Sequence, residues 1–173
     1  KITIEGIVQG VGFRPFIYQL AHRYQLSGHV INTPEGVDLE VEGSDENVED
    51  FFQSVLSESP PLAHISSMER AELRPKKNDK AFEIKESRAD QERSALISPD
   101  VSICPDCLRE LKDSKDRRFR YPFINCTNCG PRYTIIMDIP YDRAMTTMKK
   151  FKMCKACQRE YEDPTDRRFH AKP

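Results

Sequence analysis

A glycine-containing segment near the start of the chain has the residue types that capture a phosphate group. Residues 8–16 read VQGVGFRPF, and Gly10 and Gly12 allow positive φ angles that turn backbone N–H groups toward one point. Pro15 is tolerated in the first turn of a following helix, whose positive dipole end would then face the segment. Arg14 adds a permanent charge that can hold two phosphate oxygens. The segment therefore predicts a site for a compact phosphate rather than a nucleotide.

Two familiar glycine-rich loops do not match this segment. A dinucleotide-binding fingerprint needs a third glycine where the chain has Pro15, and a Walker loop needs a Gly-Lys-Ser or Gly-Lys-Thr ending. An ordinary strand-to-helix turn with an exposed arginine stays open as the alternative. Asn32 favours the phosphate interpretation, because it ends one arm of a predicted hairpin, where strand propensity does not select asparagine. Its amide can orient a water molecule; capping of the turn is the alternative role.

Four of the six cysteines have the spacing of metal ligands. Cys104, Cys107, Cys126 and Cys129 form the pattern C-x2-C-x18-C-x2-C, which is typical of two knuckles that surround a tetrahedral zinc ion. Disulfides are the alternative, but two paired knuckles with no other cysteine nearby favour zinc. Four thiolates leave zinc no open position, so the predicted role of the ion is structural. Reduced cysteines also predict a cytoplasmic setting.

The cysteine-containing half repeats itself with an offset of 50 residues. Cys154 and Cys157 repeat the first cysteine pair, and the Asp-Arg-Arg-Phe sequence at 116–119 returns at 166–169. The same offset places the second closing pair just past the last residue of the sequence. Two interpretations stay open for this second metal site. Either the remaining ligands belong to a longer protein, which we favour, or His170 supplies a third ligand.

The apolar periodicity predicts an α+β protein with a ferredoxin-like domain in the order βαββαβ over residues 1–87. Residues 88–100 are charged and polar and predict a linker. Residues 101–173 predict a small zinc-knuckle repeat domain, truncated in its second repeat. The expected elements of the first domain are a strand over 1–8, a helical stripe over 16–26, a hairpin over 28–42, a helix opened by Ser44, and closing strands over 65–73 and 81–84 that flank a charged turn over 74–80.

Charge divides unevenly between the two halves of a chain that is 32% charged, with a mean hydropathy of −0.67. Acidic residues outnumber basic ones in residues 1–100, and the reverse holds for residues 101–173. A basic zinc module raises the competing prediction of nucleic-acid binding, but the few aromatic residues near the arginines form no extended stacking surface. We therefore expect a solvated face or a docking surface. No apolar run approaches the roughly 18 residues of a membrane span.

These motifs resemble two families in succession. Residues 6–14 and 28–32 are similar to the signature of the acylphosphatases. The resemblance implies that Arg14 and the loop amides bind an acyl phosphate and that Asn32 orients the attacking water. An acyl phosphate is already activated, so positioning and charge stabilisation can supply most of the catalysis without a nucleophilic side chain. The implied phosphate-binding residues are Gln9, Gly10, Val11, Gly12, Phe13 and Arg14.

The second half resembles the zinc-finger segment of the HypF-type carbamoyltransferases, which mature [NiFe]-hydrogenases and also begin with an acylphosphatase-like domain. The similarity runs through CGPRYTII at 129–136, PYDR at 140–143 and DPTDRRFHA at 163–171. It implies that carbamoyl phosphate is hydrolysed as the first step of carbamoyl transfer toward the cyanide ligands of the hydrogenase iron. The implied zinc ligands are Cys104, Cys107, Cys126, Cys129, Cys154 and Cys157.

The same resemblance implies two further domains that this sequence lacks. One would use ATP to make a carbamoyl adenylate, and the other would transfer the carbamoyl group to the C-terminal cysteine of a partner maturation protein. This chain would then carry out the hydrolytic step alone. A non-catalytic module that binds an anion or a nucleic acid around a structural zinc stays open as the alternative.

Overall fold

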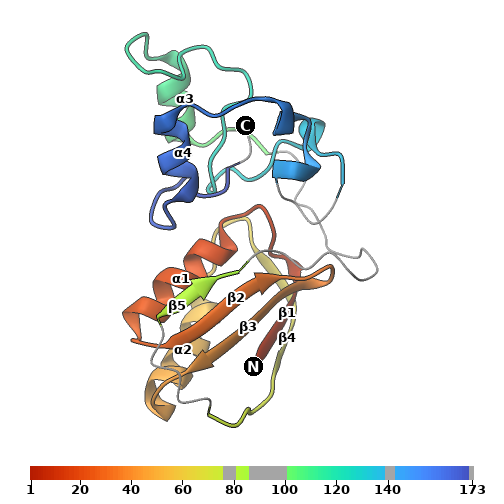
Figure 1. Ribbon diagram of the computed structural model, residues 1–173, viewed down its shortest axis with the longest axis vertical. Coiled ribbons are helices and arrows are strands. Elements are labelled where there is room, and N and C mark those ends of the chain that lie inside the picture. The colour runs from red at the N-terminus through yellow and green to blue at the C-terminus, as the bar shows by residue number, and fades with distance from the viewer. Residues whose placement is uncertain (76–80, 86–100, 139–142, 172–173) are drawn as a thin grey trace.

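The computed structural model describes residues 1–75, 81–85, 101–138 and 143–171, which form two modules (Figure 1). The first module, residues 1–85, is a sheet with two helices on one face. The second, residues 101–171, is built from short helices and loops and is called the cysteine module below. The predicted linker, most of the predicted charged turn and the Pro-Tyr-Asp sequence at 140–142 lie outside the described residues.

The first module has the predicted βαββαβ order, and the second predicted closing strand follows it. The elements are β1 (Ile2–Ile7), α1 (Phe13–Arg23), β2 (Ser27–Asn32), β3 (Gly36–Glu42), α2 (Asp45–Ser57), β4 (His64–Arg70) and β5 (Phe82–Ile84). Its five strands lie in the order β4-β1-β3-β2-β5, with β1 antiparallel to both β3 and β4 and with β5 parallel to β2. The α+β ferredoxin-like prediction is therefore confirmed.

The ends of these elements follow local chemistry, with two corrections. Ser44 caps α2 as predicted, because its hydroxyl accepts a hydrogen bond from the backbone N–H of Asn47 at 3.3 Å. The helical stripe predicted over 16–26 was too long at its end. α1 stops at Arg23, because Gln25 adopts a φ of 53° and Leu26 turns back to donate to the Ala21 carbonyl. The closing strand β4 ends at Arg70 rather than residue 73.

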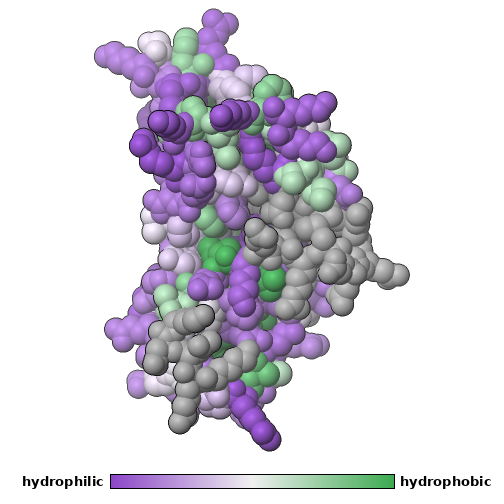
Figure 2. Space-filling model, viewed as in Figure 1, coloured by the Kyte–Doolittle hydropathy of each residue, from purple (hydrophilic) through white to green (hydrophobic). Residues whose placement is uncertain are grey.

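The two modules are stabilised by cores of different composition. Aliphatic and aromatic side chains from the sheet, α1 and α2 form the core of the first module, with Ile4, Ile17 and Phe51 fully buried. In the cysteine module the buried cluster consists of three cysteines and Ile124. Charged and polar residues cover most of the face shown in Figure 2. Within the described ranges, no helix has both the length and the hydropathy needed to cross a bilayer.

The two repeats of the cysteine module have matching helices, α3 (Pro105–Lys112) and α4 (Lys155–Glu162). Each helix is capped by the first cysteine of its pair. Cys104 Sγ accepts from the backbone N–H of Cys107 at 3.5 Å, and Cys154 Sγ accepts from that of Cys157 at the same distance. The predicted 50-residue repeat is therefore a structural repeat.

Candidate functional site

The glycine loop, residues 8–14, joins β1 to α1 and has the backbone that its sequence predicts. Gly10 and Gly12 have φ angles of 74° and 79°, in the left-handed region that suits glycine. Gly12 is also the N-cap of α1, so the first N–H groups of the helix lie directly after the loop. Val8, Val11 and Phe13 are almost fully buried and anchor the loop to the core. The loop is thus a rigid frame that presents backbone N–H groups and the positive end of a helix.

Gln9 ties the glycine loop to the turn between β2 and β3. Its Nε2 donates to the carbonyl of Thr33 at 2.7 Å and to that of Gly36 at 2.9 Å. The side chain is 2% exposed, so these bonds fix the distance between the loop and the end of β2. The side-chain N–H groups of Gln9 are therefore engaged by backbone carbonyls. Only the backbone N–H of this predicted phosphate-binding residue can contribute to anion binding.

Asn32 ends β2 beside the turn that Gln9 holds. The residue is 1% exposed and pairs with Val37 across the hairpin. Its Oδ1 atom is buried and has no hydrogen-bond partner among the described residues. A buried acceptor without a partner costs about 1–3 kcal/mol, so this oxygen is a candidate for a functional hydrogen bond.

Arg14 is the second residue of α1, and only 8% of it is exposed. It borders a cavity of about 40 Å³ that lies between the glycine loop and the cysteine module. The cavity brings together five of the predicted phosphate-binding residues, but Val11 and Asn32 are not among its described lining residues. The lining comprises Val8, Gln9, Gly10, Gly12, Phe13, Arg14 and Pro15 from the first module, and Asn125, Cys126, Thr127, Phe169, His170 and Ala171 from the cysteine module.

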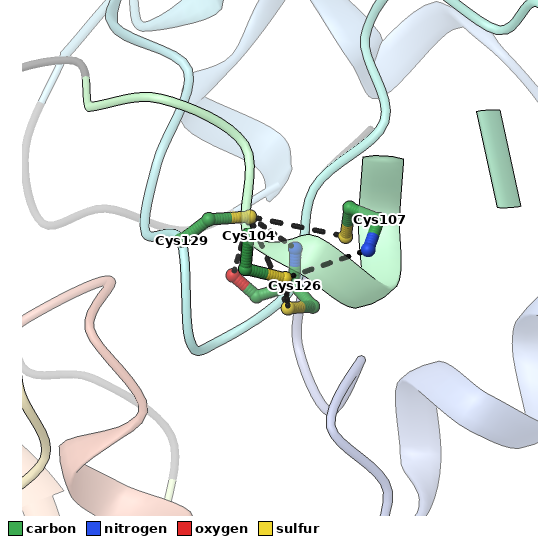
Figure 3. Close-up of side chains that lie close together, drawn as sticks. All are labelled: Cys104, Cys107, Cys126 and Cys129. Atoms are coloured by element: carbon green, nitrogen blue, oxygen red, sulfur yellow. Dashed lines mark hydrogen bonds between the residues drawn. The ribbon is translucent and has the colours of Figure 1, made fainter. Parts of the chain in front are cut away.

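The four cysteines predicted to bind zinc converge in the cysteine module (Figure 3). Their sulfur atoms all lie within 4.8 Å of one another. Cys104 Sγ lies 3.6 Å from Cys126 Sγ, and Cys129 Sγ lies 3.9 Å from the sulfurs of both Cys107 and Cys126. A tetrahedral zinc ion with Zn–S bonds of about 2.3 Å would hold its sulfurs roughly 3.8 Å apart. The donor set and its spacing therefore fit zinc.

Arginine side chains donate hydrogen bonds to two sulfurs of this cluster. Arg132 Nη2 donates to Cys129 Sγ at 3.2 Å, and Arg167 Nη1 donates to Cys107 Sγ at 3.3 Å. Hydrogen bonding among the sulfurs lowers the pKa of Cys129 far below its usual range and raises the pKa of Cys107. Since four thiolates around zinc carry a net negative charge, these donors stabilise the metal-bound state.

The second cysteine pair and His170 do not form a comparable cluster. Cys154 is exposed, and the described residues contain one group of three or more potential metal ligands, the four cysteines above. His170 instead lies beside the glycine loop, where its Nδ1 is 3.4 Å from Arg14 Nη2. The described residues therefore do not bring His170 together with Cys154 and Cys157 in a group of three ligands, and its role as a third ligand stays a prediction.

The two repeats are linked by a reciprocal exchange of ion pairs. The Asp-Arg-Arg-Phe turn of each repeat reaches the helix of the other and binds a glutamate there. Such a two-fold exchange is the arrangement of an isologous interface, formed here within one chain. The pairs are Arg117 and Arg118 with Glu160, and Arg167 and Arg168 with Glu110.

Three residues that line the cavity, Asn125, Thr127 and His170, were not predicted to lie near the phosphate site. Thr127 lies in the sequence between two cysteines predicted to bind zinc, and the sequence predicts for His170 only a role as a metal ligand. Contact between residues 14 and 170 spans 156 positions of the chain, so local periodicity and motif spacing carry no signal for it. Only the tertiary structure brings the second half of the chain to the first.

Comparison with known proteins finds a matching family for each half of the chain. Residues 1–84 match the family model described as Acylphosphatase, and residues 103–136 and 153–173 match the one described as HypF finger. The chain is 45% identical over 144 residues to the probable carbamoyltransferase HypF of Methanocaldococcus jannaschii, covering 83% of this chain and 19% of the relative. It is 35% identical over 80 residues to an acylphosphatase of Staphylococcus aureus, covering 45% of this chain and 90% of the relative.

Among solved structures, HypF proteins match nearly the whole of this chain. The crystal structure of full-length HypF in the phosphate- and nucleotide-bound form matches 99% of this chain at 54% identity, with a TM-score of 0.90. The HypF of T. kodakarensis matches the same share at 50% identity, with a TM-score of 0.81. The chain spans about a fifth of the length of these HypF relatives, 23% and 21% of the two solved chains.

Proposed function

Because this chain belongs to the acylphosphatase family over residues 1–84 and continues into a HypF finger, as HypF carbamoyltransferases do, we propose that its glycine loop hydrolyses an acyl phosphate, with carbamoyl phosphate as the substrate. The observation that carries this proposal is the meeting of the glycine loop and the buried Arg14 at one small cavity. The cavity is small, at about 40 Å³, and both the glycine loop and Arg14 line it.

The phosphate group would be held by backbone and side chain together. The N–H groups of the glycine loop and the first turn of α1 donate to its oxygens, with the helix dipole adding positive potential. The planar guanidinium of Arg14 can donate two parallel hydrogen bonds to the same group. These donors stabilise charge that develops on the phosphoryl oxygens as the bond to the acyl oxygen breaks, which is the main requirement of phosphoryl transfer.

Asn32 would orient the attacking water through its Oδ1 atom, the buried acceptor described above. The water oxygen forms a bond to phosphorus while the bond between phosphorus and the acyl oxygen breaks. Carbamate leaves as an anion, and the proton of the water passes to the products or to solvent. No strong general base is needed, because the leaving group is already stable as an anion. Gln9 contributes indirectly, by holding the loop and the end of β2 at a fixed separation.

In the longer HypF-type proteins, we propose that this hydrolysis is the first step of a carbamoyl transfer that serves [NiFe]-hydrogenase maturation. Carbamate would pass to an ATP-using part of the protein, and the carbamoyl group would pass on to the C-terminal cysteine of a partner protein. Zinc bound by Cys104, Cys107, Cys126 and Cys129 would have a structural role, because four thiolates complete its coordination. Cys154 and Cys157 would bind a second zinc ion together with ligands outside this sequence.

Nucleic-acid binding is less well supported than hydrolysis. Four of the sixteen basic residues in the second half, Arg117, Arg118, Arg167 and Arg168, are paired with the two helix glutamates. Side chains engaged in this way are not available as phosphate-contacting residues without breaking the module apart.

The test is release of inorganic phosphate from carbamoyl phosphate and from acetyl phosphate. We expect turnover of both by the unaltered chain, a loss of roughly 10²–10³-fold for Arg14→Ala, and a loss of roughly 10²-fold for Asn32→Ala. Phosphate binding without any turnover would instead identify an anion-binding module. Undiminished turnover in Arg14→Ala would contradict the proposed function.

A further inference from the structure

We propose that the cysteine module completes the acyl phosphate site and that His170 is a positioning residue for Arg14. The proposal rests on the proposed function, because it assigns Arg14 to the phosphate. It extends that function by making the first module depend on a side chain from the second repeat. Three observations carry it: the contact between the two side chains, the rigidity of His170, and the contrast with its counterpart in the first repeat.

The contact defines which atom donates and which accepts. Arg14 Nη2 lies 3.4 Å from His170 Nδ1. A guanidinium has donors only, so Nδ1 must accept, and the proton of the neutral ring must be on Nε2. A hydrogen bond from Nη2 to a fixed acceptor restricts rotation of the guanidinium. Both residues line the cavity, so this bond would hold the guanidinium at the cavity wall.

His170 is held rigidly enough to act as that acceptor. Its ring stacks with that of Phe169, at a centroid distance of 4.0 Å, and with that of Tyr161, at 4.9 Å. Its backbone N–H donates to the Tyr161 carbonyl at 3.0 Å, and its φ angle of 53° lies in the left-handed region. Non-glycine residues in this region are uncommon and concentrate at functional sites.

The zinc knuckle connects this turn to the glycine loop. Thr127, which lies between the ligands Cys126 and Cys129, donates to the Arg167 carbonyl from its backbone N–H at 2.8 Å and from its hydroxyl at 3.0 Å. The same side chain packs against the glycine loop, where a Cβ atom on Gly12 would lie 2.8 Å from Thr127 Cβ. Thr127 therefore connects the predicted metal site both to the turn that carries His170 and to the glycine loop.

The first repeat shows that the turn itself does not require histidine. Arg120 occupies the position 50 residues before His170, with a φ angle of 58° and a matching backbone hydrogen bond to the Leu111 carbonyl at 2.9 Å. Its side chain is exposed and is not among the lining residues of the cavity. Backbone geometry is therefore common to both positions, and what distinguishes His170 is its contact with Arg14.

This pair of positions supplies a matched control for the experiment. Glycine accommodates a positive φ angle without strain, so His170→Gly and Arg120→Gly each remove a side chain while preserving the turn. His170→Asn keeps an acceptor, since asparagine Oδ1 lies at the same branch position as Nδ1, and asparagine tolerates the left-handed region. The three variants are compared with the unaltered chain in carbamoyl phosphate hydrolysis, with kcat and KM determined separately.

We expect His170→Gly to lower kcat/KM by roughly 10–10²-fold, because a misaligned phosphate clamp loses transition-state stabilisation. His170→Asn should recover part of this loss, and Arg120→Gly should retain full activity. In an Arg14→Lys background, the expected further effect of His170→Gly is small, since the two residues act through one contact. Equal zinc content and equal thermal stability of the two glycine variants would confirm that neither change acts through unfolding.

Several results would overturn the proposal. Unchanged activity of His170→Gly, with Arg14→Ala inactive, would remove the positioning role while leaving hydrolysis in place. An Asn variant no better than the Gly variant would contradict the acceptor role. A loss in Arg120→Gly equal to that in His170→Gly would assign the effect to the stability of the cysteine module. Full activity of Arg14→Ala would instead show that the proposed function itself is wrong.

Discussion

The two modules differ in what stabilises them, although they meet at one cavity. The first module buries a cluster of fifteen apolar residues between its sheet and its helices. The described part of the cysteine module buries a cluster of four residues, three of them cysteines predicted to bind zinc. A cluster of that size supplies little hydrophobic stabilisation. We therefore expect the metal and the ion pairs to contribute most of the stability of this module. The comparison predicts that the same treatments will affect the two modules very differently.

Zinc removal should give the largest difference between the modules. Structural zinc sites contribute on the order of 10 kcal/mol or more to folding, so a chelator should unfold the cysteine module while the first module remains folded. Amide hydrogen exchange of the whole chain measures both regions at once. We expect protection to be lost in α3 and α4 and retained in β1, β3 and α1. Parallel loss of protection in both modules would show that they fold as one unit.

Zinc removal also tests whether the phosphate site depends on the cysteine module. If the turn that carries His170 unfolds without zinc, phosphate release should fall to about the level of His170→Gly. Addition of zinc should restore the activity. Full activity in a chain whose cysteine module has lost its exchange protection would contradict that dependence.

A substitution in the core of the first module should destabilise that module and leave the cysteine module folded. Phe51 of α2 is fully buried in the first module, and Phe51→Ala should cost about 3–5 kcal/mol through lost burial and the cavity left behind. Denaturant unfolding followed by circular dichroism gives the total change, and hydrogen exchange assigns it to a region. Zinc content should remain unchanged. Loss of zinc in this variant would mean that the cysteine module takes its stability from the first.

What the sequence predicted and what it missed follow from the range of the interactions. The positive φ angles of Gly10 and Gly12 and the cap at Ser44 depend on neighbouring residues, and these predictions were confirmed. The convergence of four cysteines was predictable because zinc geometry restricts the spacing of its ligands. Helix α1 ended early because a tertiary requirement, the burial of Leu26 after a left-handed turn, overrode the apolar stripe.

The candidate site was only half predictable for the same reason. Arg14 and Asn32 were marked by the chemistry of their residue types. The cysteine-module wall of the cavity was missed, because the packing of one module on another leaves no periodic signal in either. The sequence predicts metal binding as a possible role for His170, because a histidine ring can bind zinc. In the structure its neighbours are Arg14, Tyr161 and Phe169.

The reciprocal ion pairs of the cysteine module should contribute unequally. Glu110 and its partner Arg168 are 18% and 9% exposed, whereas Glu160 and Arg118 are 26% and 14% exposed. Hydrogen bonds to charged groups gain strength as water is excluded, so Glu110→Gln should cost about 1–3 kcal/mol and Glu160→Gln about 1 kcal/mol or less. Thermal unfolding of the zinc-loaded chain measures the difference. Equal losses would show that burial does not separate the two pairs.

The pH dependence of the Glu110 pair has a definite sign. Burial alone raises the pKa of Glu110, but hydrogen bonds from Arg168 and Arg167 outweigh it, so the net pKa is lowered. A carboxyl group with a lowered folded pKa contributes stability above its unfolded pKa of about 4.3 and loses it as the pH falls through the folded value. The cysteine module of the unaltered chain should therefore lose stability in this range more steeply than that of Glu110→Gln.

Helix caps allow a further comparison, because the two modules cap a helix with different atoms. Ser44 caps α2 with a hydroxyl, whereas Cys104 caps α3 with a sulfur that is also a predicted zinc ligand. Ser44→Ala should cost about 1 kcal/mol and lower the Tm of the first module by about 4–8 °C, with zinc content unchanged. Cys104→Ser keeps a capping oxygen but loses the thiolate, so any large loss of zinc and of exchange protection must come from the metal. A loss for Cys104→Ser as small as that for Ser44→Ala would mean that the cysteine module does not depend on its zinc site, and the contrast between the modules would then be wrong.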